Sequence, residues 1–277
     1  MVRVCRAMIF EFGPALLFCP ADRPDRYDKA AGRSPAVILD LEDAVAHSDK
    51  AAARESLVAH QLDPATTIVR INPAGTADFA ADLAAVERTE YRTIMLAKAE
   101  SPAHLRALDG YRVVVLCETA AGVLAAPSLA AHESVVALMW GAEDLIASLG
   151  GTSSRDAGGR YRDVARHARA AVLLAAGAHH KAAIDAVHVA IDDTEGLAAE
   201  AQDAMASGFA ASACIHPDQV PVILDAYRPS LEEFAWAQGV IAAASDAKGV
   251  FRYDGMMVDE PVLRHAAGVL RRADAGK

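Results

Sequence analysis

The stretch Ala36-Val-Ile-Leu-Asp-Leu-Glu-Asp43 carries the pattern that decides the fold. Its first part, Ala36–Leu41, is apolar nearly throughout, and acidic side chains gather at its end. A run of this kind is typical of a strand that is buried on both faces of a parallel sheet. Seven further runs share the pattern: Ala15–Cys19, Thr67–Ile71, Thr93–Leu96, Arg112–Cys117, Val135–Trp140, Ala183–Val187 and Ala211–Ile215. We therefore expect eight buried strands.

Stretches of helical character, many of them rich in alanine, separate these runs. They are Arg23–Ala31, Asp49–Ala59, Asp78–Arg88, Pro102–Leu108, Ala121–Ala131, Tyr161–His179, Thr194–Ala206 and Pro217–Ala226. Eight strand–helix repeats predict an α/β fold, a (β/α)₈ TIM barrel. The structural rival is an open doubly wound sheet, which usually has a glycine-rich turn after its first strand. The turn here, Cys19-Pro-Ala-Asp-Arg-Pro24, does not match that motif.

The predicted barrel domain covers residues 13–229. Residues 230–277 are expected to form a C-terminal helical lid, in which two helices flank the loop Gly249–Pro261. This tail is too short for an independent domain, so a lid or an arm that contacts a neighbouring subunit is the expected role. The residues before 13 are expected to be a loose extension.

Net charge, apolar run length and cysteine spacing disfavour several classes of protein. The net charge of −10 disfavours nucleic acid as a partner. No run of about 18 apolar residues is present, so we expect no membrane span. The four cysteines lack C-x-x-C spacing, which disfavours zinc and disulfide frameworks. A reducing cytoplasm is therefore the expected compartment.

Ionisable residues follow nearly every predicted strand. In a barrel of this type the active site lies at the carboxyl ends of the strands. The residues at those ends are Asp40, Glu42 and Asp43, then Arg70, Lys98, Glu118, Glu143 with Asp144, and His216. A barrel without a ligand does not need charged groups at one rim, so the sequence predicts a site there. For His216 a substrate role and a structural role stay equally open.

The acidic residues of this rim predict a metal ion. Converging carboxylates repel one another unless a cation lies between them. Oxygen ligands without His or Cys favour Mg²⁺. We select Glu118 and Asp144 as the metal ligands, because they follow the neighbouring fifth and sixth strands. The alternative is that these acids only cap the amino termini of helices.

Seven segments carry a family resemblance. They are Leu17–Arg26, Ile38–Asp43, Val69–Asn72, Met95–Lys98, Glu118–Gly122, Gly141–Leu145 and Cys214–Pro217. In order and spacing, from about residue 14 to about residue 265, the chain resembles citrate lyase β-subunits and their stand-alone relatives in the HpcH/HpaI aldolase/citrate lyase superfamily. That group includes malyl-CoA and citramalyl-CoA lyases, and the resemblance is greatest to the stand-alone branch.

The resemblance implies a homotrimeric (β/α)₈ barrel in which Glu118 and Asp144 hold Mg²⁺. It implies that Arg70 faces the bound keto acid and the enolate oxygen. Main-chain N–H groups around Ala142, Glu143 and Asp144 would hold the carboxylate of the small acid. Asp259, in the segment Met257-Val-Asp-Glu-Pro261, would reach into a neighbouring subunit as the catalytic acid or base.

Two further groups of residues support these roles. Asp40 and Glu42 alternate along a strand and so point the same way. Together with Lys98, they would orient Arg70 or a metal-bound water. The alternative is that they form only a salt bridge inside the barrel. Three basic residues follow the first strand at a spacing of three, which places them on one helix face: Arg23, Arg26 and Lys29. They are the candidates for the phosphates of coenzyme A, and the alternative for them is a solvated basic face.

The predicted function is therefore a Mg²⁺-dependent carbon–carbon lyase that cleaves a short 3-hydroxyacyl-CoA thioester. The acyl group, whether malyl, citramalyl, 3-hydroxy-3-methylglutaryl or citryl, stays open, because such differences depend on pocket shape. The alternatives are a malate-synthase-like condensation in the same site and a catalytically silent subunit that binds CoA or an acyl-carrier protein. Two departures from the family pattern, Ala97 in place of the usual Pro and the missing Gly-Lys before Ile215, leave the metal site unaffected.

Overall fold

The computed structural model describes residues 10–245, 247 and 249–275. The chain divides into two compact units, and the boundary lies between Ile223 and Leu224. The first unit holds the barrel and the second holds the described C-terminal residues, and each is described by itself. In the part of the chain that the structure describes, no helix combines the length and the apolar character that crossing a membrane requires.

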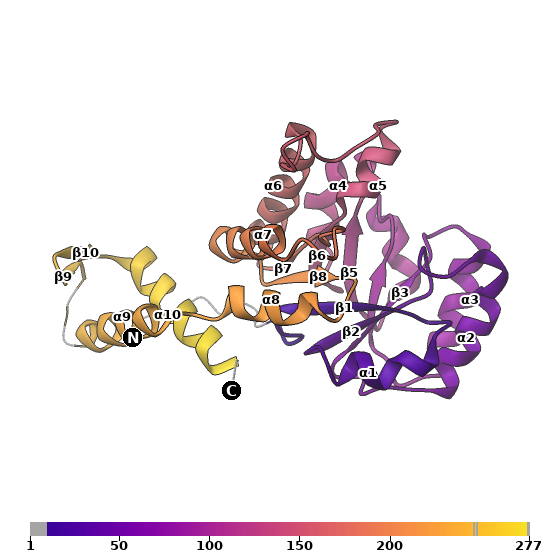
Figure 1. The fold of residues 1–277 in the computed structure, drawn as a ribbon, viewed down its shortest axis with the longest axis horizontal. Coiled ribbons are helices and arrows are strands. Elements are labelled where there is room, and N and C mark those ends of the chain that lie inside the picture. The colour runs from indigo at the N-terminus through magenta and orange to yellow at the C-terminus, as the bar shows by residue number, and fades with distance from the viewer. Residues whose placement is uncertain (1–9, 246, 248, 276–277) are drawn as a thin grey trace. The chain divides into compact units, whose positions relative to one another are not determined.

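The first unit is built on eight parallel strands that close into a barrel in the order β1 to β8, with β8 paired to β1 (Figure 1). The strands are β1 (Ala15–Pro20), β2 (Ala36–Asp40), β3 (Thr67–Ile71), β4 (Thr93–Leu96), β5 (Arg112–Cys117), β6 (Val135–Trp140), β7 (Ala182–Asp185) and β8 (Ala211–Cys214). The predicted (β/α)₈ barrel is confirmed, and each strand lies within two residues of its predicted bounds.

Helices follow the strands of the barrel (Figure 1). They are η1 (Pro24–Arg26), α1 (Tyr27–Ala31), η2 (His47–Asp49), α2 (Lys50–Ala59), α3 (Ala77–Val86), η3 (Pro102–Leu108), α4 (Ala120–Ala130), α5 (Ala142–Ser148), α6 (Asp163–Ala178), α7 (Thr194–Ser207) and α8 (Gln219–Tyr227). The helical segment predicted over Arg23–Ala31 begins one residue later, at Pro24, and consists of the 3₁₀ turn η1 followed directly by α1. Helix α5 was not predicted.

Alternation along the strands fills the barrel interior and also sets the site. Leu16, Ile38, Ile68 and Leu116 belong to one buried apolar cluster, which draws on all eight strands. Successive side chains on a strand point to opposite faces, so the residue two positions further along points the same way. Beyond Ile38, Ile68 and Leu116 those residues are polar: Asp40, Arg70 and Glu118. The inward face of the barrel therefore changes from apolar to charged at the carboxyl ends of the strands.

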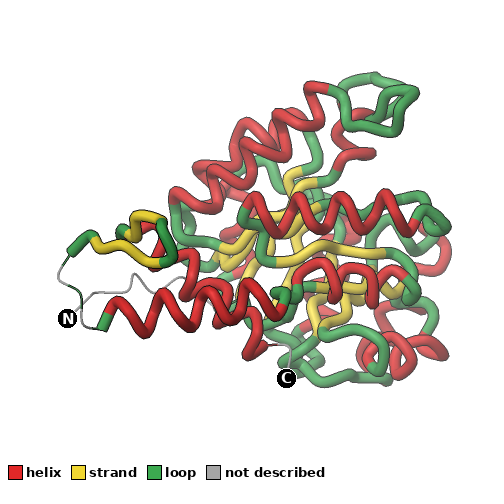
Figure 2. The backbone as a smooth tube through the Cα atoms, turned by 60° about the vertical axis from the view of Figure 1, so that its left-hand side comes forward, coloured by secondary structure: helices red, strands yellow, loops and turns green. Residues whose placement is uncertain are grey.

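The described C-terminal residues form α9 (Leu231–Ala244), a hairpin of β9 (Phe251–Tyr253) and β10 (Met256–Val258), and α10 (Glu260–Ala275). Figure 2 shows the hairpin as the two short strands next to these helices. The buried residues that join the elements are Ala237, Val240, Val258, Ala266 and Val269. The two predicted helices are present, whereas the segment predicted as a loop contains the hairpin.

Candidate active site

Arg70, the fourth residue of β3, is buried at the barrel rim and meets two carboxylates. Its Nε donates to Asp40 Oδ1 at 2.7 Å and its Nη2 to Asp40 Oδ2 at 2.6 Å. Its Nη1 lies 3.3 Å from Glu42 Oε2, and its guanidinium lies 4.8 Å from the centre of the Phe18 ring. Burial opposes the charge, yet Asp40 and Glu42 raise the pKa of Arg70 above its ordinary value. Arg70 is therefore a fixed cation in the barrel mouth.

Asp40 holds both Arg70 and the turn that follows β2. Besides the two bonds from Arg70, its carboxylate accepts the main-chain N–H groups of Glu42 at 2.9 Å and Ala44 at 3.1 Å. Both Asp40 oxygens thus have two donors each. The two alternatives left open by the sequence coincide here, since the salt bridge inside the barrel is also the contact that orients Arg70.

Lys98 follows β4, has a left-handed backbone conformation with φ of 48°, and contacts acidic residues that follow three different strands. Its ammonium forms a salt bridge with Glu42, lies 3.0 Å from Asp43 Oδ2 and lies 3.8 Å from Asp144 Oδ1. Its main-chain N–H donates to Glu118 Oε1 at 3.1 Å. Burial acts against the charge, yet Glu42 and Asp43 raise the pKa of Lys98. Lys98 therefore contacts both predicted metal ligands.

The surroundings of the Glu118 carboxylate favour a bound cation. Burial, followed by the charge of Asp144, raises the pKa of Glu118 to about 8. A Cβ atom on Gly141 would lie 3.0 Å from Glu118 Oε2, so the glycine leaves room beside that oxygen. Mg²⁺ takes one or two protein carboxylates and keeps its other positions for water and substrate. Glu118 and Asp144 fit that donor set.

Larger metal sites are not found among residues 10–245, 247 and 249–275. No group of three or more His, Cys, Asp or Glu side chains in these residues is arranged to hold a metal ion. Cys117 and Cys214 are buried, and burial raises the pKa of each thiol to about 12. Such thiols are unreactive and do not compete as soft ligands. The predicted pair of carboxylates is thus the relevant metal candidate.

Helix α5 presents the predicted carboxylate-binding segment. It begins at Ala142, after Gly141, and no side chain of the described residues caps its first turn. The N–H groups of a first helical turn have no partner within the helix. Glu143 accepts a hydrogen bond from the buried Ser154 Oγ at 2.6 Å, so a neighbouring loop contacts its side chain.

The three basic residues predicted for CoA lie on two short elements. Arg23 forms an exposed ion pair with Asp25, at 3.2 Å for Nε to Oδ1. Arg26 ends η1 and Lys29 lies in α1, and both are exposed. They follow β1 as predicted, but Arg23 does not share their helical geometry. Their contact with CoA stays a prediction.

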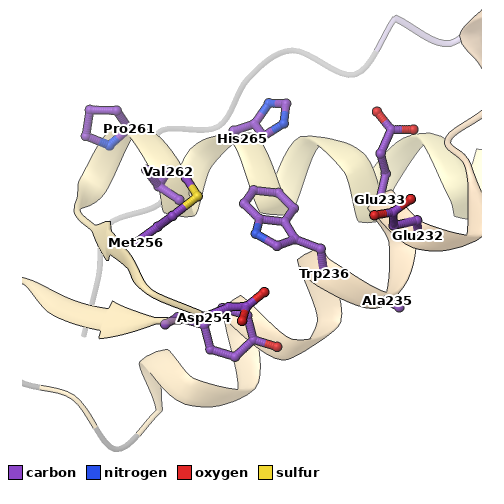
Figure 3. Close-up of a pocket in the computed structure, with 10 residues that line it drawn as sticks. Glu232, Glu233, Ala235, Trp236, Asp254, Met256, Pro261, Val262 and His265 are labelled. Carbon is purple, nitrogen blue, oxygen red and sulfur yellow. The ribbon is translucent and has the colours of Figure 1, made fainter.

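Asp259 lies in the C-terminal unit, directly before α10. Its Oδ1 accepts the N–H of Val262 at 3.3 Å, and its carbonyl accepts that of Leu263 at 3.0 Å. The structure therefore shows Asp259 as a helix cap, and its catalytic role stays a prediction. The same unit contains a groove of about 840 Å³ between α9, the hairpin and α10, in which Trp236 lies near His265 (Figure 3). Asp259 does not line this groove.

Sequence reasoning missed two polar networks around the rim. The first joins Lys50 and Asn72 to the turn after β2. The second joins His188 to Glu200 and Arg155, with His188 Nδ1 2.8 Å from Glu200 Oε2. Asn72 ends a segment that carried the family resemblance, but nothing about Lys50 in the sequence separates it from a surface lysine.

Comparison with known proteins places this geometry in a family. A "Citrate lyase subunit beta-like protein" from Mycobacterium tuberculosis is 56% identical over 94% of this chain and 96% of its own length. A "(3S)-malyl-CoA thioesterase" from Cereibacter sphaeroides is 32% identical over 94% of both chains. "Citramalyl-CoA lyase, mitochondrial" from Rattus norvegicus is 28% identical, over 95% of this chain and 86% of its own.

A solved structure agrees with these relatives. The protein CitE from Mycobacterium tuberculosis, in complex with magnesium, acetoacetate and coenzyme A, matches with a TM-score of 0.89 and 56% identity, over 95% of this chain and 98% of that one. The family described as HpcH/HpaI aldolase/citrate lyase matches residues 15–217, which span the strands of the barrel. The chain therefore belongs to the HpcH/HpaI aldolase/citrate lyase family.

Proposed function

We propose that this protein is a Mg²⁺-dependent carbon–carbon lyase that cleaves a short 3-hydroxyacyl-CoA thioester to an acyl-CoA and a keto acid or glyoxylate. The observation that carries the proposal is the pairing, at one rim, of the fixed Arg70 cation with the carboxylates of Glu118 and Asp144. Such a rim can stabilise negative charge on oxygen, which both the alkoxide and the enolate of this reaction carry. The lyase relatives support the same class of reaction.

The residues of the rim divide the work between them. Arg70 faces the oxyanion that develops when the carbon–carbon bond opens, and Asp40 keeps its guanidinium from turning away. Glu118 and Asp144 hold Mg²⁺, which when bound polarises the hydroxyl and carboxylate oxygens of the acid. The N–H groups of α5 around Ala142 bind that carboxylate. Asp259, supplied by a neighbouring subunit of a homotrimer, carries the proton.

The thioester is held outside the rim. Arg23, Arg26 and Lys29 bind the phosphates of CoA, and the coenzyme A in the CitE complex supports this class of ligand. Buried, unbridged Cys19, Cys117 and Cys214 support a reducing compartment, and we propose the cytoplasm. The acyl group is identified by assay with a panel of thioesters.

The decisive experiment is a product assay. Purified protein is incubated with Mg²⁺ and malyl-, citramalyl-, 3-hydroxy-3-methylglutaryl- and citryl-CoA, and the release of keto acid and of free thiol is followed separately. A lyase releases keto acid or glyoxylate while the thioester bond stays intact. The expected result is release that requires Mg²⁺, acts on one ester of the panel, and is lost in Glu118→Ala.

Three other outcomes would each contradict the lyase. Free thiol without keto acid identifies a thioesterase, the activity named for the Cereibacter sphaeroides relative. Synthesis from acetyl-CoA and glyoxylate without cleavage identifies a condensing enzyme. Binding of CoA without any turnover identifies a silent subunit.

A further inference from the structure

A buried lysine lies directly behind the acidic turn of the site. Lys50, the first residue of α2, is 9% exposed. Its ammonium donates to the carbonyls of Leu41 at 2.8 Å and Glu42 at 2.9 Å, and to Asn72 Oδ1 at 2.8 Å. An ammonium has three protons to donate, and all three are used here. Lys50 therefore has no donor left for a substrate.

Asn72 and Asp82 anchor this lysine to the rest of the barrel. Asn72 Nδ2 donates to the carbonyl of Leu41 at 2.9 Å and to Asp82 Oδ2 at 2.7 Å, and its main-chain N–H donates to the same Asp82 oxygen. Asp82 is fully buried in α3, and its other oxygen accepts Arg54 Nε at 2.7 Å. The two carbonyls of the turn are thus held by side chains from α2 and from the end of β3.

The turn that Lys50 holds includes Glu42, whose carboxylate contacts both Arg70 and Lys98. Glu42 is 3% exposed, and its oxygens meet Arg70 Nη1 at 3.3 Å and the Lys98 ammonium. Because Lys50 binds the carbonyl of Glu42 itself, any shift of that main chain moves the carboxylate. A small displacement of a group in an active site reduces the reaction rate strongly.

We propose that Lys50 is a positioning residue for the reaction, fixing the main chain of Leu41 and Glu42 so that the Glu42 carboxylate bridges Arg70 and Lys98. This inference rests on the proposed function, since it assigns Lys50 an effect on that chemistry. The competing explanation is that Lys50 only stabilises the barrel. The two explanations differ in whether its effect on the reaction passes through Glu42.

A double-mutant cycle separates them. Lys50→Met keeps the chain length and removes the three donors, and we expect kcat to fall about 10- to 100-fold, as for other residues that orient a site from behind. In the Glu42→Gln background the same change lowers kcat less than about 3-fold, because the group it positions is already altered. Thermal stability falls in both backgrounds. Equal losses of kcat in both backgrounds, or a folded Lys50→Met enzyme with wild-type kcat, would overturn the inference.

Two further variants keep the test decisive. Lys181→Met is the matched control, because its ammonium also donates to a main-chain carbonyl, that of His132 at 3.3 Å, at the other end of the strands. It leaves kcat within about 2-fold of the wild type. If Lys50→Met does not fold, Asn72→Ala replaces it in the cycle, with a smaller loss of kcat that again shrinks in the Glu42→Gln background.

The cycle also has a readout that needs no turnover. Binding of pyruvate in the presence of Mg²⁺ is measured by calorimetry for the four proteins of the cycle. We expect Lys50→Met to weaken pyruvate about 10-fold in the wild-type background and hardly at all beside Glu42→Gln. If the wild type turns over no thioester, the proposed lyase fails while this readout still decides the role of Lys50. An active wild type with equal losses in both backgrounds refutes the positioning role alone.

Discussion

Arg70 binds Asp40 through Nε and Nη2, and its third nitrogen, Nη1, lies on the Glu42 side of the rim. Only a planar, forked cation can make this paired contact and still present a donor elsewhere. Lysine offers a point charge at the end of a flexible chain. The site therefore depends on the shape of the guanidinium as well as on its charge.

Arg70→Lys is expected to lower kcat about 10²- to 10³-fold, the loss typical of one oxyanion donor, while Mg²⁺ affinity stays close to that of the wild type. Steady-state kinetics with the preferred thioester and calorimetry with Mg²⁺ measure the two effects. Arg88→Lys is the matched control, since Arg88 also makes a paired contact with a carboxylate, through Nη1 and Nη2 to Glu55 on the exposed surface. Wild-type kcat in Arg70→Lys would show that the guanidinium has no part in the reaction.

Gly141 allows a test of the metal site, because it lies close to the Glu118 side chain. Its φ of −125° is open to alanine, but a Cβ there would lie 2.9 Å from Glu118 Cβ and 3.0 Å from Glu118 Oε2. We expect Gly141→Ala to displace the Glu118 carboxylate and to weaken Mg²⁺ about 10- to 100-fold. A Cβ atom on Gly177 in α6 would meet no atom of the described residues within 4 Å, so Gly177→Ala should leave Mg²⁺ affinity unchanged. Equal affinity of both variants, measured by calorimetry, would argue against Glu118 as a ligand.

At the scale of elements, His188 joins the segment after β7 to α7, and Glu200 in turn joins α7 to Arg155 in the loop before α6. His188 Nδ1 lies 2.8 Å from Glu200 Oε2 and its Nε2 lies 3.2 Å from Asp193 Oδ2. The hydrogen bond with Glu200 raises the pKa of His188, against burial and the charge of Arg155. A histidine whose pKa is raised on folding stabilises fully below its unfolded value of about 6.5, and loses that stabilisation as pH rises through its folded value.

His188→Gln is therefore expected to lower the free energy of unfolding more at about pH 6 than at about pH 9. Urea unfolding is followed by fluorescence in a Trp236→Phe background, where Trp140 of the barrel is the remaining tryptophan. His60→Gln is the control, because His60 is exposed and its ring contacts a local carbonyl, that of Ser56. A loss from His188→Gln that is the same at both pH values would contradict the charged His188–Glu200 pair.

The elements that the sequence predicted well are those with strong local patterns. Runs such as Thr67–Ile71 and Val135–Trp140 match their predicted bounds, because apolar side chains on both faces suit a strand enclosed by helices. The hairpin was missed although Asp254-Gly255 is a pair favoured in tight hairpin turns, and in the structure both residues adopt the positive φ that such a turn requires, 45° and 79°. Its strands have only three residues each, too few for a visible alternation.

The positions of three rim side chains follow directly from strand alternation. Asp40, Arg70 and Glu118 lie two residues beyond core positions, so one rule locates all three. Lys50 contacts residues eight and nine positions earlier in the chain, and Asn72 reaches it across 22 residues. Contacts of that kind depend on how the first turn of α2 lies against β2 and β3, which no local pattern encodes.

At the scale of the whole molecule, the proposed reaction needs groups from two units. The barrel supplies Arg70, Glu118 and Asp144, whereas Asp259 belongs to the C-terminal unit, where it caps α10. Every subunit of the proposed homotrimer would then hold a barrel site completed by the C-terminal unit of a neighbour. A closed ring of three identical contacts gives each site one barrel and one neighbouring arm.

Complementation between two inactive variants tests this arrangement. Glu118→Ala removes a barrel ligand and Asp259→Asn removes the proposed proton carrier, so each homotrimer is inactive. In trimers assembled from equal amounts of both, a site is complete when an Asp259→Asn barrel meets a Glu118→Ala arm, which random assembly gives in about a quarter of sites. We expect co-expressed variants to recover about that fraction of wild-type activity, and variants mixed without subunit exchange to recover none. If Asp259 instead served the barrel of its own chain, every mixed trimer would stay inactive, because each chain carries one of the two lesions.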